Sequence, residues 1–213
     1  MKISVNDNTL SLMVGDITEQ TTDFIVNAAN GSLLGGGGVD GAIHRVAGPK
    51  LLEVNKRIRK QLLNNDYLPT GEAVVTKGFN LAALYVIHTV GPVWENQGTE
   101  QQLLANCYQS CLSLAYMMDR SMQTAIKENA GYLSRDVQLQ TLENKKTTSI
   151  SFPSISTGVY RFPIEQAAII ALTTIYHFLN EYTFGEVVMT LFSEADLTVY
   201  QSTLERIIEE RKS

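Results

Sequence analysis

Short apolar runs rich in β-branched residues alternate along the chain with longer segments whose apolar positions recur every three or four residues. The first pattern predicts buried strands, and the second predicts amphipathic helices. The predicted strands are Lys2–Val5 at an edge, Leu10–Val14, Asp23–Val26, Ala73–Lys77, Tyr85–Thr89, Ser149–Phe152 and Val187–Phe192. The predicted helices are Val39–Ala47, Pro49–Leu63, Glu100–Met118, Pro163–Tyr182 and Asp196–Arg211. This alternation predicts an α/β fold, a three-layer α/β/α sandwich in which ligands bind outside the carboxyl ends of the strands.

Helix ends and one long connection complete this outline. Pro49 and Pro163 fit the first turn of the helices that they open, and Gly48 fits a helix end. The segment Ser121–Thr147 is longer than a helix-to-strand connection needs, and its apolar pattern is loosely amphipathic. We therefore predict a single domain over residues 1–213, with a helical insertion packed on its surface at residues 121–147.

Composition narrows the class of protein. The 213 residues are 44% hydrophobic and 18% charged, which favours one folded domain over a disordered chain. A net charge of −5 argues against a protein whose main function is to bind the backbone of a nucleic acid. No apolar run is long enough to span a membrane, and the first residues lack a signal-peptide core. We expect a cytoplasmic protein with no membrane or nucleic-acid partner, and the oligomeric state stays open.

Cys107 and Cys111 are the only cysteines, and their spacing places both on one predicted helix. That geometry does not suit a structural disulfide framework, so they are interpreted as reduced core residues. No Cys-x-x-Cys occurs, and zinc needs more ligands than this pair offers. We expect neither a metal nor a cofactor.

A run of four glycines, Gly35, Gly36, Gly37 and Gly38, directly precedes a predicted helix. Glycine permits positive φ and lets the backbone approach a ligand closely. The unpaired N–H groups at the start of the helix add partial positive charge, which suits a phosphate. The alternative is a flexible surface linker, which would order four residues at an entropic cost without a gain.

Asp40 lies in the first turn of this helix, and His44 follows one turn later on the same face. The simpler interpretation is a helix-stabilising acid and a packed histidine. Beside a phosphate loop, however, a carboxylate can also orient a hydroxyl group or a water near the ligand. Neighbouring phosphates disfavour its charged form, which would tune its basicity.

Two asparagines, Asn27 and Asn30, flank Ala28 and Ala29 at the end of an apolar strand. Small alanines permit close approach, and an asparagine amide can donate to and accept from a sugar hydroxyl. The alternative is an Asx turn at a strand end, which weighs about equally for Asn27 and less for Asn30.

Further loops follow other strands. Ser156, Thr157, Gly158, Val159 and Tyr160 form a second loop with a glycine and hydroxyls, so that two loops could hold both halves of a diphosphate.

Gly15-Asp16-Ile17-Thr18 ends another strand. There Asp16 could accept a hydrogen bond from an exocyclic amine and the Ile17 N–H could pair with a ring nitrogen, although Gly-Asp is also a common turn. Phe192 could stack on a base or lie in the core. His88 and His177 are interpreted as packed histidines.

These motifs taken together resemble the macrodomain family, in its MacroD-type branch. The resemblance rests on Gly15–Thr18, Asn27–Asn30, Gly35–Arg45 and Ser156–Tyr160, and further on Pro69–Ala73 and Tyr85–Pro92. It covers nearly all of the chain except Ser121–Thr147, with the motifs in the right order.

The resemblance implies a mixed sheet between helices and a cleft for ADP-ribose. By this likeness Asp16 and Ile17 read adenine, Phe192 stacks on it, the two loops hold the diphosphate, and Asn30 and Asp40 face the distal ribose. The ligand-binding positions implied are Gly15, Asp16, Ile17, Ala28, Ala29, Asn30, Gly35, Gly36, Gly37, Gly38, Val39, Asp40, Ile155, Ser156, Thr157, Gly158, Val159, Tyr160, Arg161 and Phe192.

Two departures from the family pattern stand out. Arg161 occupies a position where the family often has glycine, so it either adds a phosphate contact or narrows the opening of the site. The segment Ser121–Thr147 has no counterpart in compact members. The zinc-dependent branch is disfavoured, because Asp40 stands where a metal-binding variant would rearrange the motif.

The resulting hypothesis is a metal-independent hydrolase of ADP-ribosyl esters, acting on ADP-ribosylated aspartate and glutamate side chains, on O-acetyl-ADP-ribose, or on both. Asp40 would position or activate water, Asn30 would orient the distal ribose, and His44 would support Asp40. The partners would be ADP-ribose or ADP-ribosylated proteins. The alternatives are a non-catalytic ADP-ribose reader module, an ADP-ribose 1″-phosphate phosphatase and a single-stranded RNA binder, the last disfavoured by the acidic composition.

Overall fold

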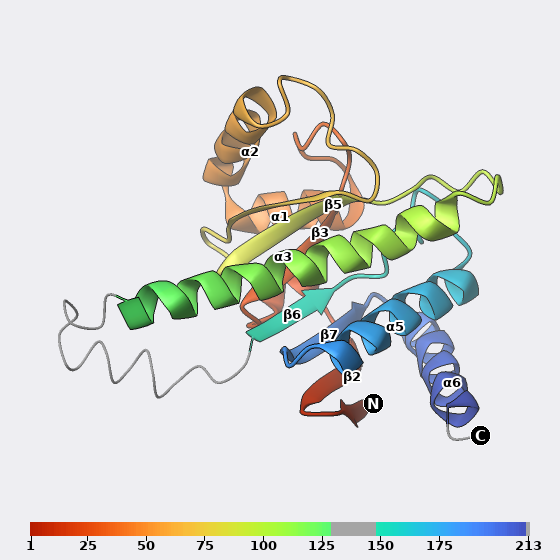
Figure 1. Cartoon of the computed structure of the whole chain (residues 1–213). Coiled ribbons are helices and arrows are strands. Elements are labelled where there is room, and N and C mark those ends of the chain that lie inside the picture. Colours follow the sequence, from red (N-terminus) through yellow and green to blue (C-terminus); the bar gives the residue numbers. More distant parts are fainter. Residues whose placement is uncertain (129–147, 212–213) are drawn as a thin grey trace.

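A seven-stranded mixed sheet forms the centre of the molecule (Figure 1) in a computed structural model that describes residues 1–128 and 148–211. The strands lie in the order β1-β2-β7-β6-β3-β5-β4. Their bounds are β1 Lys2–Val5, β2 Asn8–Val14, β3 Phe24–Ala29, β4 Ala73–Lys77, β5 Tyr85–Val90, β6 Thr148–Phe152 and β7 Gly185–Leu191. The helices are α1 Gly38–Ala47, α2 Pro49–Gln61, α3 Glu100–Glu128, α5 Ile164–Glu181 and α6 Glu194–Glu210, with a short 3-10 helix η1 at Ile17–Glu19.

Strand direction determines where loops gather. Five strands, β2, β7, β6, β3 and β5, run parallel to one another. The two outermost strands, β1 and β4, are antiparallel to their neighbours. The carboxyl ends of the five parallel strands therefore meet at one edge of the sheet. The loops after β2, β3, β5, β6 and β7 lie at that edge.

The two faces of the sheet carry different helices, as the predicted three-layer sandwich requires. Alternate residues of β3 point to opposite faces. Phe24 and Val26 belong to a large apolar cluster with α3, α5 and α6, whereas Ile25 between them packs with Ile43 of α1 and Leu51 of α2. The same alternation repeats on β5. The three-layer α/β/α prediction is confirmed.

Most predicted elements exist, and the bounds of several differ from those predicted. Strand β3 runs on to Ala29, three residues past the predicted end at Val26, so the turn begins only at Asn30. Strand β7 ends at Leu191, which leaves Phe192 outside the sheet. Helix α5 begins one residue after Pro163, whose ψ of 127° is extended. Helix α6 begins earlier, at Glu194, because the Ser193 hydroxyl accepts the Asp196 N–H at 3.1 Å and caps it.

Helix α3 is longer than predicted and takes in the start of the proposed insertion, residues 121–128. The remainder of that insertion, residues 129–147, lies outside the described residues, so the insertion stays a prediction. Cys107 and Cys111 lie on α3, buried and without a disulfide, as expected. Burial raises the pKa of the Cys107 thiol to about 11, which keeps it protonated. Of the helices described, none is long and apolar enough to cross a membrane.

Candidate active site

Backbone hydrogen bonds join the loops at the carboxyl edge of the sheet. The Gly15 N–H donates to Leu191 O at 3.0 Å and links the ends of β2 and β7. The Trp94 N–H donates to Tyr160 O at 2.9 Å and links the loop after β5 to the loop after β6. The loops after β2 and β7, and those after β5 and β6, are therefore joined in pairs at this edge.

The glycine loop leads into α1 with its amides open. Gly37 is the N-cap in an extended conformation, and no side chain caps the helix. Gly36, Gly37 and Gly38 are exposed, while Gly35 and Gly38 have positive φ values of 89° and 59°. Exposed N–H groups at the positive end of a helix favour an anion. A Cβ at Gly36 would lie 3.1 Å from both Asn30 Nδ2 and Asp40 Oδ2, so this glycine keeps the backbone close to both side chains.

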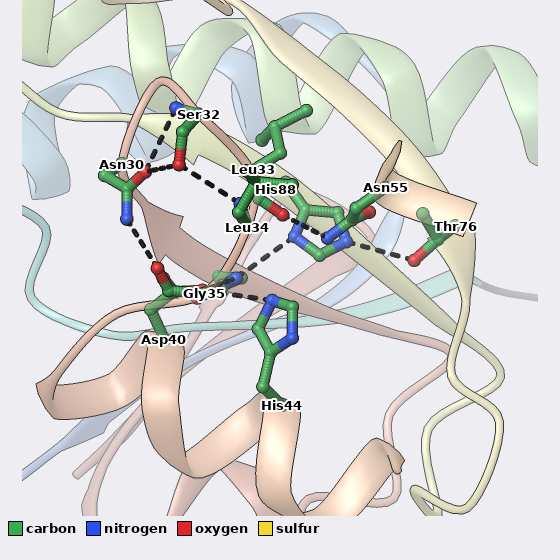
Figure 2. Close-up of polar contacts among 11 residues, drawn as sticks. Asn30, Ser32, Leu33, Leu34, Gly35, Asp40, His44, Asn55, Thr76 and His88 are labelled. Atoms are coloured by element: carbon green, nitrogen blue, oxygen red, sulfur yellow. Dashed lines mark hydrogen bonds and ion pairs between the residues drawn. The ribbon is translucent and has the colours of Figure 1, made fainter. Parts of the chain in front are cut away.

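Asn30 is held by its own loop (Figure 2). Its Oδ1 accepts the Ser32 N–H at 3.0 Å and the Ser32 hydroxyl, which makes the Asx turn that the sequence favoured less at this position. Its Nδ2 donates one hydrogen to Gly35 O at 2.9 Å. The amide carries a second hydrogen, and it lies beside Asp40 across Gly36.

Asp40 is a buried carboxylate with one hydrogen-bonded and one unpaired oxygen. Its Oδ1 accepts a hydrogen bond from Asn27 Nδ2 at 2.7 Å and lies 3.5 Å from His44 Nε2. Its Oδ2 has no hydrogen-bond partner in the described part of the chain. Burial raises the pKa of the Asp40 carboxyl, and the Asn27 hydrogen bond and the nearby His44 ring oppose that rise. Such a carboxylate is suited to holding and activating a water.

A hydrogen-bond relay reaches Asp40 from inside the sheet. Asn27 and His88 are register partners on β3 and β5, and Asn27 Nδ2 contacts His88 Nδ1 at 3.0 Å. Because Asn27 Nδ2 is a donor, His88 Nδ1 accepts, and the ring proton lies on Nε2. That Nε2–H donates to Thr76 Oγ1 on β4 at 3.0 Å. Burial, with a smaller effect from His44, lowers the pKa of His88 to about 3, so the ring is neutral near neutral pH.

The second loop follows β6 and is tightly wound. Ser156 and Arg161 have positive φ values of 68° and 56°, and the Arg161 N–H donates to Gly158 O at 2.9 Å. Gly158 and Val159 are exposed, whereas the buried Ser156 Oγ has no hydrogen-bond partner among the residues described. Ile155 is fully buried, and its N–H donates to the Tyr108 hydroxyl at 3.2 Å. Ile155 therefore packs in the hydrophobic core beneath the loop.

The proposed adenine end lies at the neighbouring strands β2 and β7. Asp16 caps η1, with its Oδ1 accepting from the Thr18 N–H at 2.8 Å and from the Thr18 hydroxyl at 2.7 Å. The Phe192 side chain is 94% exposed, so it is not the core aromatic of the alternative interpretation. An aromatic ring this open at the rim of a binding surface has a free face for stacking.

Comparison with known proteins decides the family. The Macro domain family model matches residues 26–171. The chain belongs to the macrodomain family. This macrodomain is 49% identical to a solved Oceanobacillus iheyensis macrodomain with ADP, with a TM-score of 0.84 over 99% of this chain and 97% of that one.

Two named relatives are enzymes. An O-acetyl-ADP-ribose deacetylase of Escherichia fergusonii is 42% identical over 197 residues, which are 92% of this macrodomain and 94% of the relative. The human ADP-ribose glycohydrolase MACROD2 is 42% identical over 199 residues, which are 92% of this chain and 39% of the relative.

Sequence reasoning missed two features of this macrodomain. Asn27 is completely buried, so it neither forms an Asx turn nor reaches a sugar; instead it holds Asp40. His177 is exposed beside Arg211 and is not the packed residue expected. The alternation of apolar residues in β3 was the available signal for Asn27, because position 27 shares a face with Ile25. In the described ranges, no group of three or more His, Cys, Asp or Glu side chains could hold a metal.

The relay makes Thr76 a positioning residue for Asp40. Replacing it in Thr76→Val leaves the His88 Nε2–H without an acceptor, which should lower the free energy of unfolding by about 1–3 kcal/mol. The freed ring can also shift its proton to Nδ1, which would then face the Asn27 donor and disturb the hydrogen bond to Asp40. In steady-state assays we expect kcat to fall while KM changes little. Thr76→Ser should restore both kcat and the free energy of unfolding, the latter measured by urea titration.

Thr190→Val is the matched control for this test. Thr190 is another buried strand threonine, and its Oγ1 has no partner within residues 1–128 and 148–211. Its replacement should leave stability unchanged or improve it. An equal loss of kcat in Thr76→Val and Thr190→Val would show that the Thr76–His88 hydrogen bond does not orient the site.

Arg161 occupies a backbone conformation that favours glycine. A non-glycine residue in the left-handed region costs about 1–2 kcal/mol. We expect Arg161→Gly to be more stable than Arg161→Ala by about 1 kcal/mol, since both remove the side chain and only the first relieves the φ of 56°. Chemical denaturation of the two variants measures this, and equal stability would contradict it.

Proposed function

We propose that this macrodomain binds ADP-ribose and hydrolyses ADP-ribosyl esters, those on aspartate or glutamate side chains of proteins and that of O-acetyl-ADP-ribose. The observation that carries the proposal is the buried Asp40 carboxylate, whose unpaired Oδ2 lies beside an uncapped helix start. The relatives named as a deacetylase and a glycohydrolase support it.

The geometry assigns a part to each group. The exposed amides of Gly36–Gly38 bind the diphosphate, and the loop at Ser156–Tyr160 closes over it. Asn30 directs its remaining amide hydrogen to the distal ribose. Asp40 Oδ2 accepts a hydrogen bond from a water and takes its proton as the water oxygen attacks the ester carbonyl carbon. The bond between that carbon and the ribose oxygen then breaks, and the proton passes to the departing ribose oxygen. His44 and Asn27 hold the other carboxylate oxygen in place.

Phe192, Asp16 and Ile17 complete the proposal at the adenine end. The open ring of Phe192 stacks on the base, and the Asp16 carboxylate with the backbone of η1 provides polar contacts. Cytoplasmic residence, expected from the sequence, also belongs to this proposal, and fractionation of cells expressing the protein tests it.

A hydrolase assay tests the proposal. The protein is mixed with a carrier mono-ADP-ribosylated on glutamate, in parallel with one modified on serine, and released ADP-ribose is measured. We expect release from the glutamate-linked carrier alone. Binding of ADP-ribose without release from either carrier, or from O-acetyl-ADP-ribose, would identify a reader module instead.

A further inference from the structure

An open groove of about 420 Å³ lies between α2 and the loop that leads to α1. Its lining consists of Leu34, Lys56, Arg59, Lys60 and Asn65. The three cations stand at positions i, i+3 and i+4 of α2 and therefore share one face of the helix. Three positive charges in one groove are notable in a chain whose net charge is −5.

These charges are not neutralised locally. Over residues 1–128 and 148–211, no carboxylate lies within ion-pair distance of Lys56, Arg59 or Lys60. The Asp66 Oδ1 accepts the Tyr67 N–H at 2.7 Å. Arg59 is fixed in place, because its Nε donates to Asp66 O at 3.3 Å and its guanidinium lies 5.0 Å from the centre of the Tyr67 ring. The groove thus presents a partly preorganised positive surface.

A short piece of chain joins the groove to the active site (Figure 2). Leu33 O accepts a hydrogen bond from Asn55 Nδ2 of α2 at 3.0 Å, and the Leu34 N–H donates to Ser32 Oγ at 3.2 Å. Ser32 in turn donates to Asn30 Oδ1. Leu34, which is 39% exposed, therefore sits on the lip between Asn30 and the cationic face of α2.

We propose that this groove binds an acidic polypeptide segment flanking the ADP-ribosylated side chain of a protein substrate. The inference rests on the proposed function, which places the scissile ester beside Asn30 and Asp40. A polypeptide attached through that ester must leave the site past the surrounding surface, and the cationic groove beyond Leu34 complements an acidic chain there. O-acetyl-ADP-ribose has no such segment, so only the protein substrate uses the groove.

The double variant Lys56→Glu with Lys60→Glu tests this, with Arg59 left intact because it holds Tyr67. The substrates are an acidic peptide ADP-ribosylated on glutamate and O-acetyl-ADP-ribose. We expect kcat/KM for the peptide to fall at least tenfold, through KM, and kcat/KM for O-acetyl-ADP-ribose to stay unchanged. The matched control is Lys50→Glu with Arg57→Glu, which makes the same change of charge on α2 outside the groove.

If kcat/KM for the peptide falls equally in both double variants, or does not fall in Lys56→Glu with Lys60→Glu, the proposal for the groove is wrong. The proposed hydrolase activity would not be affected by that result. A binding measurement keeps the test independent of catalysis. A fluorescent oligoglutamate peptide should bind the wild-type protein, and its affinity should fall as the salt concentration rises. Its affinity for the variant Lys56→Glu with Lys60→Glu should be lower than for the wild type. If a single-stranded oligonucleotide of equal charge binds this face more tightly than the peptide, the surface is a nucleic-acid site and the proposal fails.

Discussion

Replacing Asp40 with asparagine should lower the turnover of an ADP-ribosyl ester by roughly 10²–10⁴-fold and leave the affinity for ADP-ribose nearly unchanged. The variant Asp40→Asn keeps the size of the side chain and an oxygen that can accept from Asn27 Nδ2, so the loop geometry survives. What it loses is the basic oxygen at the position of Oδ2. Single-turnover rates and calorimetric titration with ADP-ribose separate the two effects. Parallel losses of rate and affinity would show that Asp40 binds the ligand and does not act on water.

The same carboxyl should control the acidic side of the pH profile. Its pKa is raised above the ordinary value of 3.8, because burial penalises the charged form. A base with that pKa is inactive when protonated, so kcat/KM should rise with pH through the raised value. The residual activity of Asp40→Asn should lack that rise.

Stability should change in the opposite sense. A raised folded-state pKa stabilises the protein fully below pH 3.8, and this contribution is lost as pH rises through the raised value. Asp40→Asn removes that dependence, and the variant should be more stable than the wild type near neutral pH. If the denaturation midpoints of the wild type and of Asp40→Asn show the same dependence on pH, the assignment of the raised pKa to Asp40 is contradicted.

The second large effect is expected from Gly41→Ala. A Cβ at this position would lie 2.6 Å from Gly36 O, closer than such contacts occur, and a backbone atom cannot swing aside. Alanine would otherwise stabilise an interior helix position by about 1 kcal/mol. The clash should outweigh that gain and lower the free energy of unfolding by about 1–3 kcal/mol. Because relief requires α1 and the glycine loop to separate, ADP-ribose affinity should fall as well.

Gly37→Ala is the matched control for stability. It lies in the same loop, has an ordinary φ of −94°, and no heavy atom lies within 4 Å of the Cβ it would gain. Its unfolding free energy should stay within about 0.5 kcal/mol of the wild type. If Gly41→Ala proves as stable as this control, the close approach between α1 and the loop is not needed.

The sequence predicted the loops of the site well because strand ends follow from local patterns. Glycines before a helix, and polar residues after apolar runs, can be found without knowing the partners of any strand. The relay from Thr76 through His88 to Asn27 could not be predicted in that way. It joins β4, β5 and β3, and only the register of the sheet places Asn27 opposite His88.

The error at Asn27 has the same origin. Asn-Ala-Ala-Asn has none of the β-branched residues that mark a strand, so the strand was predicted to end at Val26. Pairing of Asn27, Ala28 and Ala29 with β5 overrides that low strand propensity, since each gains a ladder position. The end of α3 was missed because its apolar pattern weakens after Met118 while the helix continues to Glu128.

The directions of α3 and β6 have a practical consequence. Helix α3 ends at Glu128 and β6 begins at Thr148, and the site is built where β6 ends, after Phe152. The amino end of a parallel strand lies at the edge of the sheet opposite to its carboxyl end (Figure 1). A fluorophore attached near the end of α3 would therefore lie at the edge remote from the ligand. The polypeptide could be tethered to a surface there for single-molecule measurements with its ligand-binding edge left free.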